Sequence, residues 1–386
     1  MKRKLLGITG IRSEYDATYP VYEAIRQHID LNLELVVCGS HLSHQHGYSI
    51  KNIEKDQFKI VDTIDYLIDS RLGFDRVKGL GLLIIGLAQT VKRVKPDIIF
   101  VSGDREETIA AALIGNYYNI PVAHLFGGDS AFSNADDPIR HGTSKLAHIH
   151  LVACKDHEQR LIKMGEENFR INLVGSPSLD RYLNTPTMTR SELAKVLDFD
   201  IINDPIVVLI QHPLSSEVDH SYEHMQITME AIKELKIKTI AIYPNIDPGS
   251  REIINVLEEY RGLPYLKIFK NLDRMNFGNL LRHASCLIGN SSCGLLEAPF
   301  LKLPVINIGN RQKGRTNAGN VIFVRNNKQE IIDYSKKIIY NSNFKNELIS
   351  KIDQFYFGDG KSGKKIAEIL ASINIDDKLL IKNNTY

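Results

Sequence analysis

A run of titratable side chains follows an apolar segment near the middle of this chain, in residues 124–150, HLFGGDSAFSNADDPIRHGTSKLAHIH. Two glycines, Gly127 and Gly128, end the apolar segment, and Asp129 follows them directly. Glycine lets a ligand approach the backbone closely. A carboxylate at such a place is a candidate catalytic group.

The second part of the same stretch has helical spacing and carries further charged groups. Asp136 and Asp137 can simply cap a helix, with Pro138 in its first turn. Capping leaves Arg140 and His141 unexplained, because they come one turn later. Asp129, Arg140 and His141 together are therefore candidate residues of an active site.

Two other apolar runs in the first half end in polar residues. GITGIRSEYD places Arg12 in a turn before a helix that we expect to begin near Ala17, and such a turn suits an anion. The turn lacks the G-x-G-x-x-G spacing of a dinucleotide site. VSGDREET places Asp104 directly after a strand, although acidic residues are also favoured in the first turn of a helix.

Two runs in the second half end in the same way, in IQHPLSSE and IYPNIDPGS. His212 and Glu217 belong to the first, and Asn245 and Asp247 to the second. Each group has a structural alternative, because a lone histidine is often a satisfied structural residue. All four are candidate ligand-binding residues.

LIGNSSCGLLEAP and the following INIGNRQKGR form the clearest anion site in the sequence. Ser291 and Ser292 offer hydroxyls and amides where a strand turns into a helix, which is the usual form of a phosphate cradle. Glu297 suits the hydroxyls of a ribose, and Arg311 and Arg315 add positive charge. This group predicts a nucleoside diphosphate.

The elements that must position these residues are short β-branched strands that alternate with helices, the pattern of a parallel sheet covered by helices. The expected strands are KLLGIT, LELVVCG, DIIFVSG, VAHLF, HLVAC and INLVG in the first half, and PIVVLIQH, KTIAIYPN, YLKIF, SCLIGN and PVINIG in the second. We therefore predict an α/β protein with two Rossmann-like, doubly wound domains and a ligand cleft between them. Ligands gather at the carboxyl ends of such strands. The expected boundaries are 1–183 for the first domain, 184–357 for the second domain, which would bind the nucleotide, and 358–386 for a helical tail that packs back on the first domain.

Length and composition narrow the class of protein. At ~100–200 residues per domain, 386 residues point to two domains. A net charge of +2 argues against a broad nucleic-acid or membrane surface. The four cysteines lack metal-type spacing, and the start of the chain does not read as a signal peptide. We expect a cytoplasmic protein.

The ordered motifs resemble those of the UDP-N-acetylglucosamine 2-epimerase family, and within it the hydrolysing branch that supplies sialic-acid-type sugars. The matching motifs are TGIRSEY, SGDREET, HLFGGD…DDPIRHGTSKLAHIHLV, VGSPSLD, QHP…SE, YPNIDPGS, GNSSCGLLEAP and GNRQKGR. They cover the chain from Gly7 to about Arg315. The resemblance implies two domains in the arrangement of GT-B glycosyltransferases, with UDP held mostly by the second.

The resemblance also implies roles for individual residues. His212 and the pair Ser291–Ser292 would hold the diphosphate, with Arg12 reaching it across the cleft. Glu297 would bind the ribose, and Arg311 would add charge near the phosphates. The carboxylates that would face the sugar are Asp104, Asp129 and Asp137.

The implied reaction inverts C2 of the sugar and releases UDP through a glycal intermediate, and it needs no cofactor or metal. The sequence departs from the family where Asp129 replaces a glutamate common in relatives. The first loop also has Ile11-Arg12-Ser13-Glu14 where relatives often have Thr-Arg-Ala-Asp. These departures leave the sugar open between N-acetylglucosamine and a 2,4-diacetamido-2,4,6-trideoxy sugar of legionaminic acid synthesis. They also leave GDP open beside UDP.

Three alternatives share the same nucleotide site. A non-hydrolysing epimerase would return a nucleotide sugar, a GT-B glycosyltransferase would need an acceptor, and a sensor would bind without turnover. The DD-x-x-RH…KLAHIH motif favours the hydrolysing epimerase. We expect a homo-oligomer, either a dimer or a tetramer.

Overall fold

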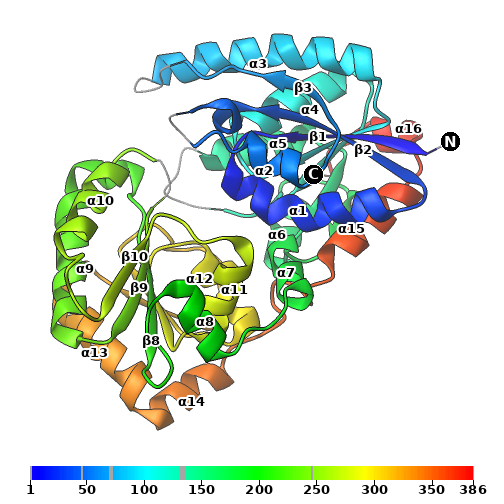
Figure 1. The fold of residues 1–386 in the computed structure, drawn as a ribbon. Coiled ribbons are helices and arrows are strands. Elements are labelled where there is room, and N and C mark those ends of the chain that lie inside the picture. The colour runs from blue at the N-terminus through cyan, green and yellow to red at the C-terminus, as the bar shows by residue number, and fades with distance from the viewer. Residues whose placement is uncertain (1, 45–46, 69–72, 131–135, 245–246, 386) are drawn as a thin grey trace. The chain divides into compact units, whose positions relative to one another are not determined.

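The structure is a computed structural model that describes residues 2–44, 47–68, 73–130, 136–244 and 247–385. The chain forms two compact units, shown in Figure 1. Unit 1 comprises Met1–Ser130, Ala135–Arg181 and Gly358–Tyr386, and unit 2 contains Tyr182–Phe357. The last residues of the chain thus belong to the same unit as the first.

Unit 1 contains a seven-stranded parallel sheet in the order β3-β2-β1-β4-β5-β6-β7. Its strands are β1 (Arg3–Thr9), β2 (Leu31–Cys38), β3 (Ile60–Ile64), β4 (Ile98–Ser102), β5 (Val122–Leu125), β6 (Ile149–Val152) and β7 (Ile171–Leu173). The strand order reverses direction between β1 and β4. Ligands of open α/β sheets bind at such a switch point, outside the carboxyl ends of the strands.

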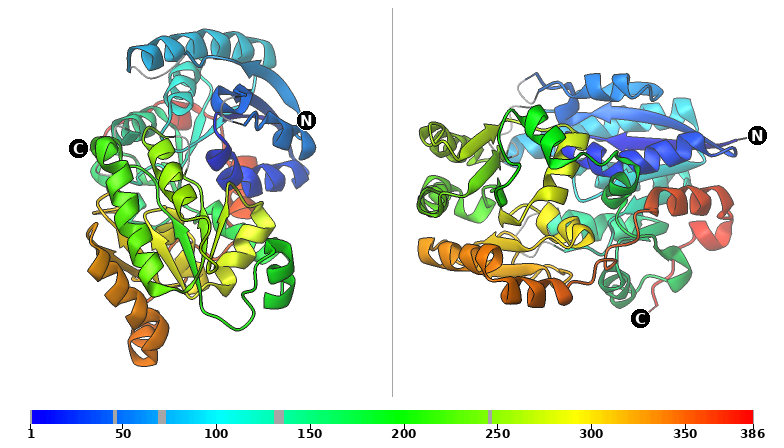
Figure 2. Two further views of the ribbon diagram at one scale, coloured as in Figure 1. Left: turned by 60° about the vertical axis from the view of Figure 1, so that its left-hand side comes forward. Right: turned by 60° about the horizontal axis from the view of Figure 1, so that its bottom comes forward.

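Helices cover both faces of this sheet, as the additional views of Figure 2 show. They are α1 (Arg12–Gln27), α2 (Ile50–Lys55), α3 (Gly73–Val94), α4 (Glu106–Tyr118), α5 (Asp136–Leu146), α6 (Lys155–Lys163), α7 (Asp180–Asn184, which continues into unit 2), α15 (Ser362–Ser372) and α16 (Asp377–Leu380), with 3-10 turns at Gly39–Leu42, Asn168–Arg170 and Pro177–Leu179. Alternate strand residues face opposite sides: Leu5 packs in the core with α1 and α15, and Leu6 packs in the core with α3 and α4. Both faces are therefore buried, which explains the nearly continuous apolar strands.

Unit 2 contains a six-stranded parallel sheet in the order β10-β9-β8-β11-β12-β13. Its strands are β8 (Ile206–Ile210), β9 (Lys238–Ile242), β10 (Leu266–Phe269), β11 (Cys286–Gly289), β12 (Val305–Ile308) and β13 (Val321–Val324). Its helices are α8 (Arg190–Leu197), α9 (Ser221–Leu235), α10 (Ser250–Glu259), α11 (Arg274–His283), α12 (Cys293–Leu296), α13 (Lys328–Tyr340) and α14 (Ser342–Ser350), with 3-10 turns at Ser215–His220 and Ala298–Leu301. One core joins α9, α10 and α13 to the sheet.

The predicted class of two doubly wound α/β domains is confirmed, and all eleven expected strands are present. Two further strands, β3 and β13, were not predicted; each lies at the edge of its sheet. The helix expected near Ala17 begins at Arg12, so that prediction was wrong by about one turn and a half. In the described part of the chain, no helix is long and apolar enough to cross a membrane.

Candidate active site

The turn after β5 brings the first group of candidate residues together in unit 1. Gly128 has a φ of +76°, and a Cβ added there would lie 2.3 Å from the carbonyl oxygen of His157. Only glycine fits this backbone. The turn ends in Asp129, whose side chain is almost fully buried.

Arg140 of α5 is the centre of this group. Its guanidinium pairs with Asp104, which follows β4, and its Nη1 lies 3.8 Å from Oδ2 of Asp129. Nη1 also donates to the carbonyl of Phe126 at 3.1 Å. Burial opposes the charge of Arg140, but Asp104 and Asp129 outweigh it, so the pKa of Arg140 is raised. A fixed cation thus holds two carboxylates that come from different strand ends.

Ser130 connects Asp129 to a third carboxylate. Its backbone N–H donates to Oδ1 of Asp129 at 2.8 Å, and its hydroxyl donates to Oδ2 of Asp137 at 2.6 Å. The structure therefore brings Asp104, Asp129, Asp137 and Arg140 into one network. Ser130 was not predicted, although its place next to Asp129 is a signal that could have been used.

His157 of α6 also contacts this network, with its Nε2 3.3 Å from Oδ1 of Asp129. The histidine is 1% exposed. The sequence gives no local signal for this contact, because 28 positions separate the two residues and α6 packs here only in the folded chain.

Two further titratable groups on α5 have pKa values that burial shifts. Burial first, and then the charge of Asp104, raise the pKa of Asp136 to about 6. Burial also lowers the pKa of His141, although Asp137 partly opposes the shift. Both groups lie on the helix that carries Asp137 and Arg140.

A buried polar layer lies beneath the ends of β1 and β4. Glu107 accepts a hydrogen bond of 2.6 Å from the hydroxyl of Tyr66. Glu14 accepts from Thr9 at 2.6 Å, and burial, opposed by this bond, raises the pKa of Glu14 to about 8. Arg12 begins α1 and pairs with Asp16, with 3.8 Å between Nε and Oδ2.

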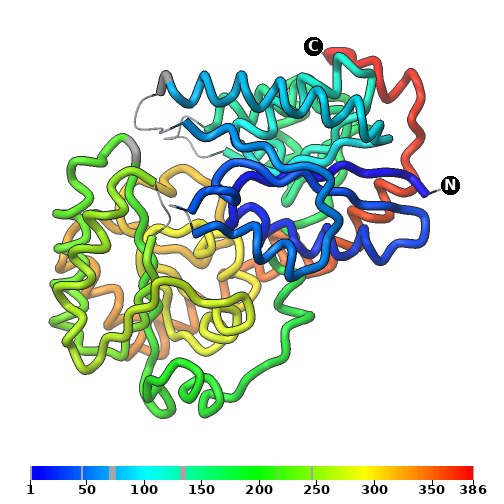
Figure 3. Tube along the Cα trace, turned by 45° about the horizontal axis from the view of Figure 1, so that its top comes forward, coloured from blue at the N-terminus to red at the C-terminus, as the bar shows by residue number. Residues whose placement is uncertain are grey.

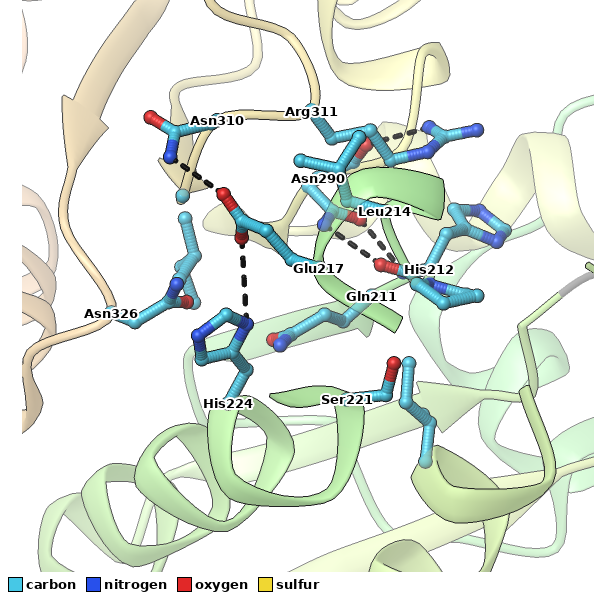
Figure 4. Close-up of a pocket in the computed structure, with 14 residues that line it drawn as sticks. Gln211, His212, Leu214, Glu217, Ser221, His224, Asn290, Asn310, Arg311 and Asn326 are labelled. Atoms are coloured by element: carbon cyan, nitrogen blue, oxygen red, sulfur yellow. Dashed lines mark hydrogen bonds and ion pairs between the residues drawn. The ribbon is translucent and has the colours of Figure 1, made fainter. Parts of the chain in front are cut away.

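Unit 2 holds the second group of candidate residues, around a pocket at the carboxyl ends of its strands (Figure 4). Asn290 follows β11 and ties it to the end of β8. Its Oδ1 accepts from the backbone N–H of His212 at 2.7 Å, and its Nδ2 donates to the carbonyl of His212 at 2.9 Å. Arg311 in turn donates to the carbonyl of Asn290 at 2.9 Å. The structure thus places His212 and Arg311 around Asn290.

Glu217 projects into the same pocket, as Figure 4 shows. Its Oε1 accepts from Nδ2 of Asn310 at 2.9 Å, and its Oε2 lies 3.8 Å from Nδ1 of His224. Asn310 and His224 were not predicted. Both line the pocket because the loop after β12 and helix α9 meet at Glu217 in the folded chain.

The remaining predicted residues of unit 2 have varied surroundings. Ser291 and Ser292 are half-buried and lead into α12. Glu297 lies just after α12, and its Oε2 accepts from the hydroxyl of Tyr182 at 2.7 Å. Arg315 donates to the side chain of Gln312 at 2.9 Å. The carbonyl of Asp247 accepts from the N–H of Ser250 at 3.0 Å, and Asn245 lies outside the described residues.

Neither group of residues is arranged as a metal centre. Across the described ranges, no cluster of three or more His, Cys, Asp or Glu side chains could hold a metal ion. The chemistry of the two groups is instead that of carboxylates beside buried cations in unit 1, and of amide and guanidinium donors in unit 2. Such donors suit an anionic ligand.

Comparison with known proteins identifies the family. The family model described as UDP-N-acetylglucosamine 2-epimerase matches residues 23–371. The hydrolysing UDP-N,N'-diacetylbacillosamine 2-epimerase of Legionella pneumophila is 33% identical over 386 residues, which is 100% of both chains. The hydrolysing GDP/UDP-N,N'-diacetylbacillosamine 2-epimerase of Campylobacter jejuni is 31% identical, covering 83% of this chain and 84% of its own.

A solved structure shows the same fold. The UDP-GlcNAc 2-epimerase of Neisseria meningitidis, bound to UDP-GlcNAc, superimposes with a TM-score of 0.82 at 18% identity, over 95% of this chain and 99% of its own. The family model and the two relatives identify the family, and the solved structure has the same fold. The chain belongs to the UDP-N-acetylglucosamine 2-epimerase family.

Proposed function

We propose that this protein is a hydrolysing nucleotide-sugar 2-epimerase that converts a UDP-linked 2-acetamido sugar and water to UDP and the free, C2-inverted sugar. The observation that carries this proposal is the network of Asp104, Asp129 and Asp137 around the buried Arg140. Two carboxylates after neighbouring strands and a third at the start of α5 suit the removal and return of a proton. The two named hydrolysing relatives support the same reaction.

The proposed reaction has two steps, and the carboxylates act in both. A carboxylate removes the proton from C2, the electron pair forms a C1–C2 double bond, and the C1–O bond to UDP breaks. Water then adds to C1 of the resulting glycal while a proton returns to the opposite face of C2. Cations near the phosphates favour the first step because UDP carries away negative charge.

The two units would divide this work. We assign proton transfer to Asp104, Asp129 and Asp137, with Arg140 fixing the carboxylates and His141 available as a neutral acceptor. His212, Glu217, Asp247, Ser291–Ser292, Glu297, Arg311 and Arg315 would bind the nucleotide in unit 2, Asn245 would join them, and Arg12 would support the phosphates. His212 and Arg311 carry this assignment, because both are held at Asn290.

The names of the two relatives also guide the choice of sugar. We propose a UDP-linked 2,4-diacetamido-2,4,6-trideoxy sugar as the substrate, with UDP-N-acetylglucosamine as the alternative. The free product would then enter the synthesis of a sialic- or legionaminic-type acid. We place the enzyme in the cytoplasm, where its four free cysteines would stay reduced.

Incubation of the protein with a panel of UDP- and GDP-linked amino sugars, without any acceptor, tests this function. We expect UDP and one free inverted sugar in equal amounts. Interconversion of two nucleotide sugars without free sugar would indicate a non-hydrolysing epimerase. Turnover only after addition of an acceptor would indicate a glycosyltransferase, and tight binding without turnover would indicate a sensor.

A further inference from the structure

The last residues of the chain are held firmly against unit 1, to which Figure 3 shows the red end of the trace returning. The guanidinium of Arg170, which is fully buried, donates to three backbone carbonyls of this segment. The distances are 2.5 Å to Leu379, 3.0 Å to Lys378 and 2.8 Å to Ile381. Leu379 itself is buried in the core of the unit. This segment is therefore an integral part of the unit.

Lys382, which follows these anchored residues, reaches the carboxyl end of α5. Its Nζ donates to the carbonyls of Ser144 at 3.2 Å, Lys145 at 2.8 Å and Ala147 at 2.6 Å. The last carbonyls of a helix have no partner within the helix, and a cation stabilises them. Lys382 thus caps a helix that lies more than 200 positions earlier in the sequence.

The positive charge of Lys382 is itself compensated. Its Nζ lies 2.7 Å from Oε2 of Glu166, whose side chain is 1% exposed. The same carboxylate meets Nε2 of His150 at 2.8 Å and Nζ of Lys145 at 2.9 Å. Burial opposes the charge of Glu166, but its bonds to His150 and Lys382 outweigh it and lower its pKa to about 2. The carboxylate therefore stays ionised and fixes both lysines.

The helix that Lys382 caps is the one that carries the proposed catalytic residues. Arg140 and His141 lie one turn before Ser144. The hydroxyl of Ser144 contacts Nδ1 of His124 at 3.2 Å, and Nε2 of His124 contacts the carbonyl of Gly103, next to the candidate Asp104, at 2.8 Å. A shift at the end of α5 would therefore move groups on both α5 and the end of β4.

We propose that Lys382 is a positioning residue for catalysis, and that the C-terminal segment 378–385 fixes the catalytic helix α5 through it. The effect on catalysis rests on the proposed epimerase function. The contact with the helix end stands on the distances alone. A displacement of about 1 Å at a catalytic group can reduce turnover about 100-fold.

Replacement of Lys382 by methionine tests the proposal in the full-length protein, because methionine keeps the length of the side chain and removes the cap. We expect kcat to fall 10- to 100-fold, as about 1 Å of misplacement would cause, while KM for the nucleotide sugar and the affinity for UDP change less than about twofold. Lys364→Met is the matched control, because Lys364 is an exposed lysine of α15 in the same unit, and it should behave as wild type. A kcat of Lys382→Met within about twofold of wild type would overturn the proposal. A loss of UDP affinity as large as the loss of kcat would also overturn it.

The pH profile separates positioning from general stability. Burial lowers the pKa of Lys382 to about 8, although Glu166 opposes this shift. The other charged or titratable groups that face this cluster are Lys145, Arg170, His124, His148 and His150. Burial lowers the pKa of all three histidines, so they are neutral above pH 8. We expect kcat of the wild type to fall above about pH 8, and kcat of Lys382→Arg to stay constant there because the guanidinium keeps its charge. Equal profiles would contradict the proposal.

Hydrogen exchange makes the test independent of the reaction. Amides of α5 should exchange faster in Lys382→Met than in wild type or in Lys364→Met, since an uncapped helix end opens more often. If the wild type converts no sugar of the panel but this exchange increases, the proposed function fails and the capping role stands. If the exchange of α5 is unchanged, the capping role fails, whatever the protein catalyses.

Discussion

At the scale of single residues, the candidate site of unit 1 depends on one buried cation. Arg140 is 5% exposed and holds Asp104 and Asp129, and Ser130 joins Asp129 to Asp137. An unpaired carboxylate at such a buried place would take up a proton. The guanidinium therefore places a fixed positive charge beside Asp104 and Asp129, the carboxylates to which we assign proton transfer.

Replacement of Asp104 or Asp137 by asparagine tests these roles. Each variant should lose turnover about 10²- to 10⁴-fold, the usual contribution of a general acid or base. The affinity for UDP, measured by calorimetry, should stay within about twofold of wild type because unit 2 carries the proposed nucleotide site. Asp204→Asn changes an exposed carboxylate of unit 2 and serves as the control. A large loss of UDP affinity in either variant would reassign that residue to nucleotide binding.

The residues of this site could be predicted in part from the sequence. Asp104, Asp129, Asp137 and Arg140 stand directly after strands or on one helix face, so local patterns pointed to them. His157 contacts Asp129 only because α6 folds back on the turn, and local spacing does not report such a contact. The sequence predicted Asp136 as a possible helix cap. It could not predict the raised pKa of Asp136, because burial and the charge of Asp104 cause this shift only in the folded chain.

At the scale of elements, the turn after β5 decides where Asp129 lies. The backbone of Gly128 has a positive φ and passes close to α6. This close approach to α6 was not predicted. From the glycine pair, the sequence predicted only the close approach of a ligand. It did not predict β3 and β13, because β3 reads IVDTI, with an aspartate in the middle, and β13 has only one fully buried residue. Edge strands are exposed on one side. β3 lacks the apolar run of a central strand, whereas β13 reads VIFV and was missed although it is apolar throughout.

Gly128→Ala should therefore damage both stability and catalysis. A positive φ and a contact of 2.3 Å should lower the free energy of unfolding by about 1–3 kcal/mol, the cost of such strain. Turnover should fall about 100-fold if Asp129 moves by about 1 Å. Urea denaturation and the UDP-release assay measure the two effects.

Gly81→Ala is the matched control for this substitution. Gly81 lies in α3, with nothing within 4 Å of an added Cβ, so alanine should raise helix stability by up to about 1 kcal/mol. A Gly128→Ala protein with wild-type stability and turnover would show that the turn does not constrain Asp129.

At the scale of the whole molecule, the two parallel sheets position two different sets of polar side chains near the carboxyl ends of their strands. Unit 1 holds carboxylates at the ends of β4 and β5, and unit 2 holds amide and guanidinium donors at the ends of β8, β11 and β12. The repeated alternation of strand and helix predicted both sheets. It could not predict the contact of Lys382 with α5, since that contact joins segments more than 200 positions apart.

Variants of unit 2 should lose affinity for UDP, whereas the carboxylate variants of unit 1 should lose turnover. His212→Ala or Arg311→Ala should weaken UDP binding about 10- to 100-fold, since a hydrogen bond to a charged group contributes about 1.5–3 kcal/mol. Calorimetry with UDP alone measures this effect. Unchanged UDP affinity in both variants would exclude the proposed nucleotide site at Asn290.

The position of deuterium in the released sugar tests the proposed reaction most directly. The wild-type protein is incubated in deuterium oxide with the UDP-linked diacetamido sugar or UDP-N-acetylglucosamine, and the products are observed by NMR. We predict a free sugar that is inverted at C2 and carries one deuterium there, together with an equal amount of UDP. A released sugar with retained C2 configuration and no deuterium would contradict an epimerase that acts by removing the C2 proton.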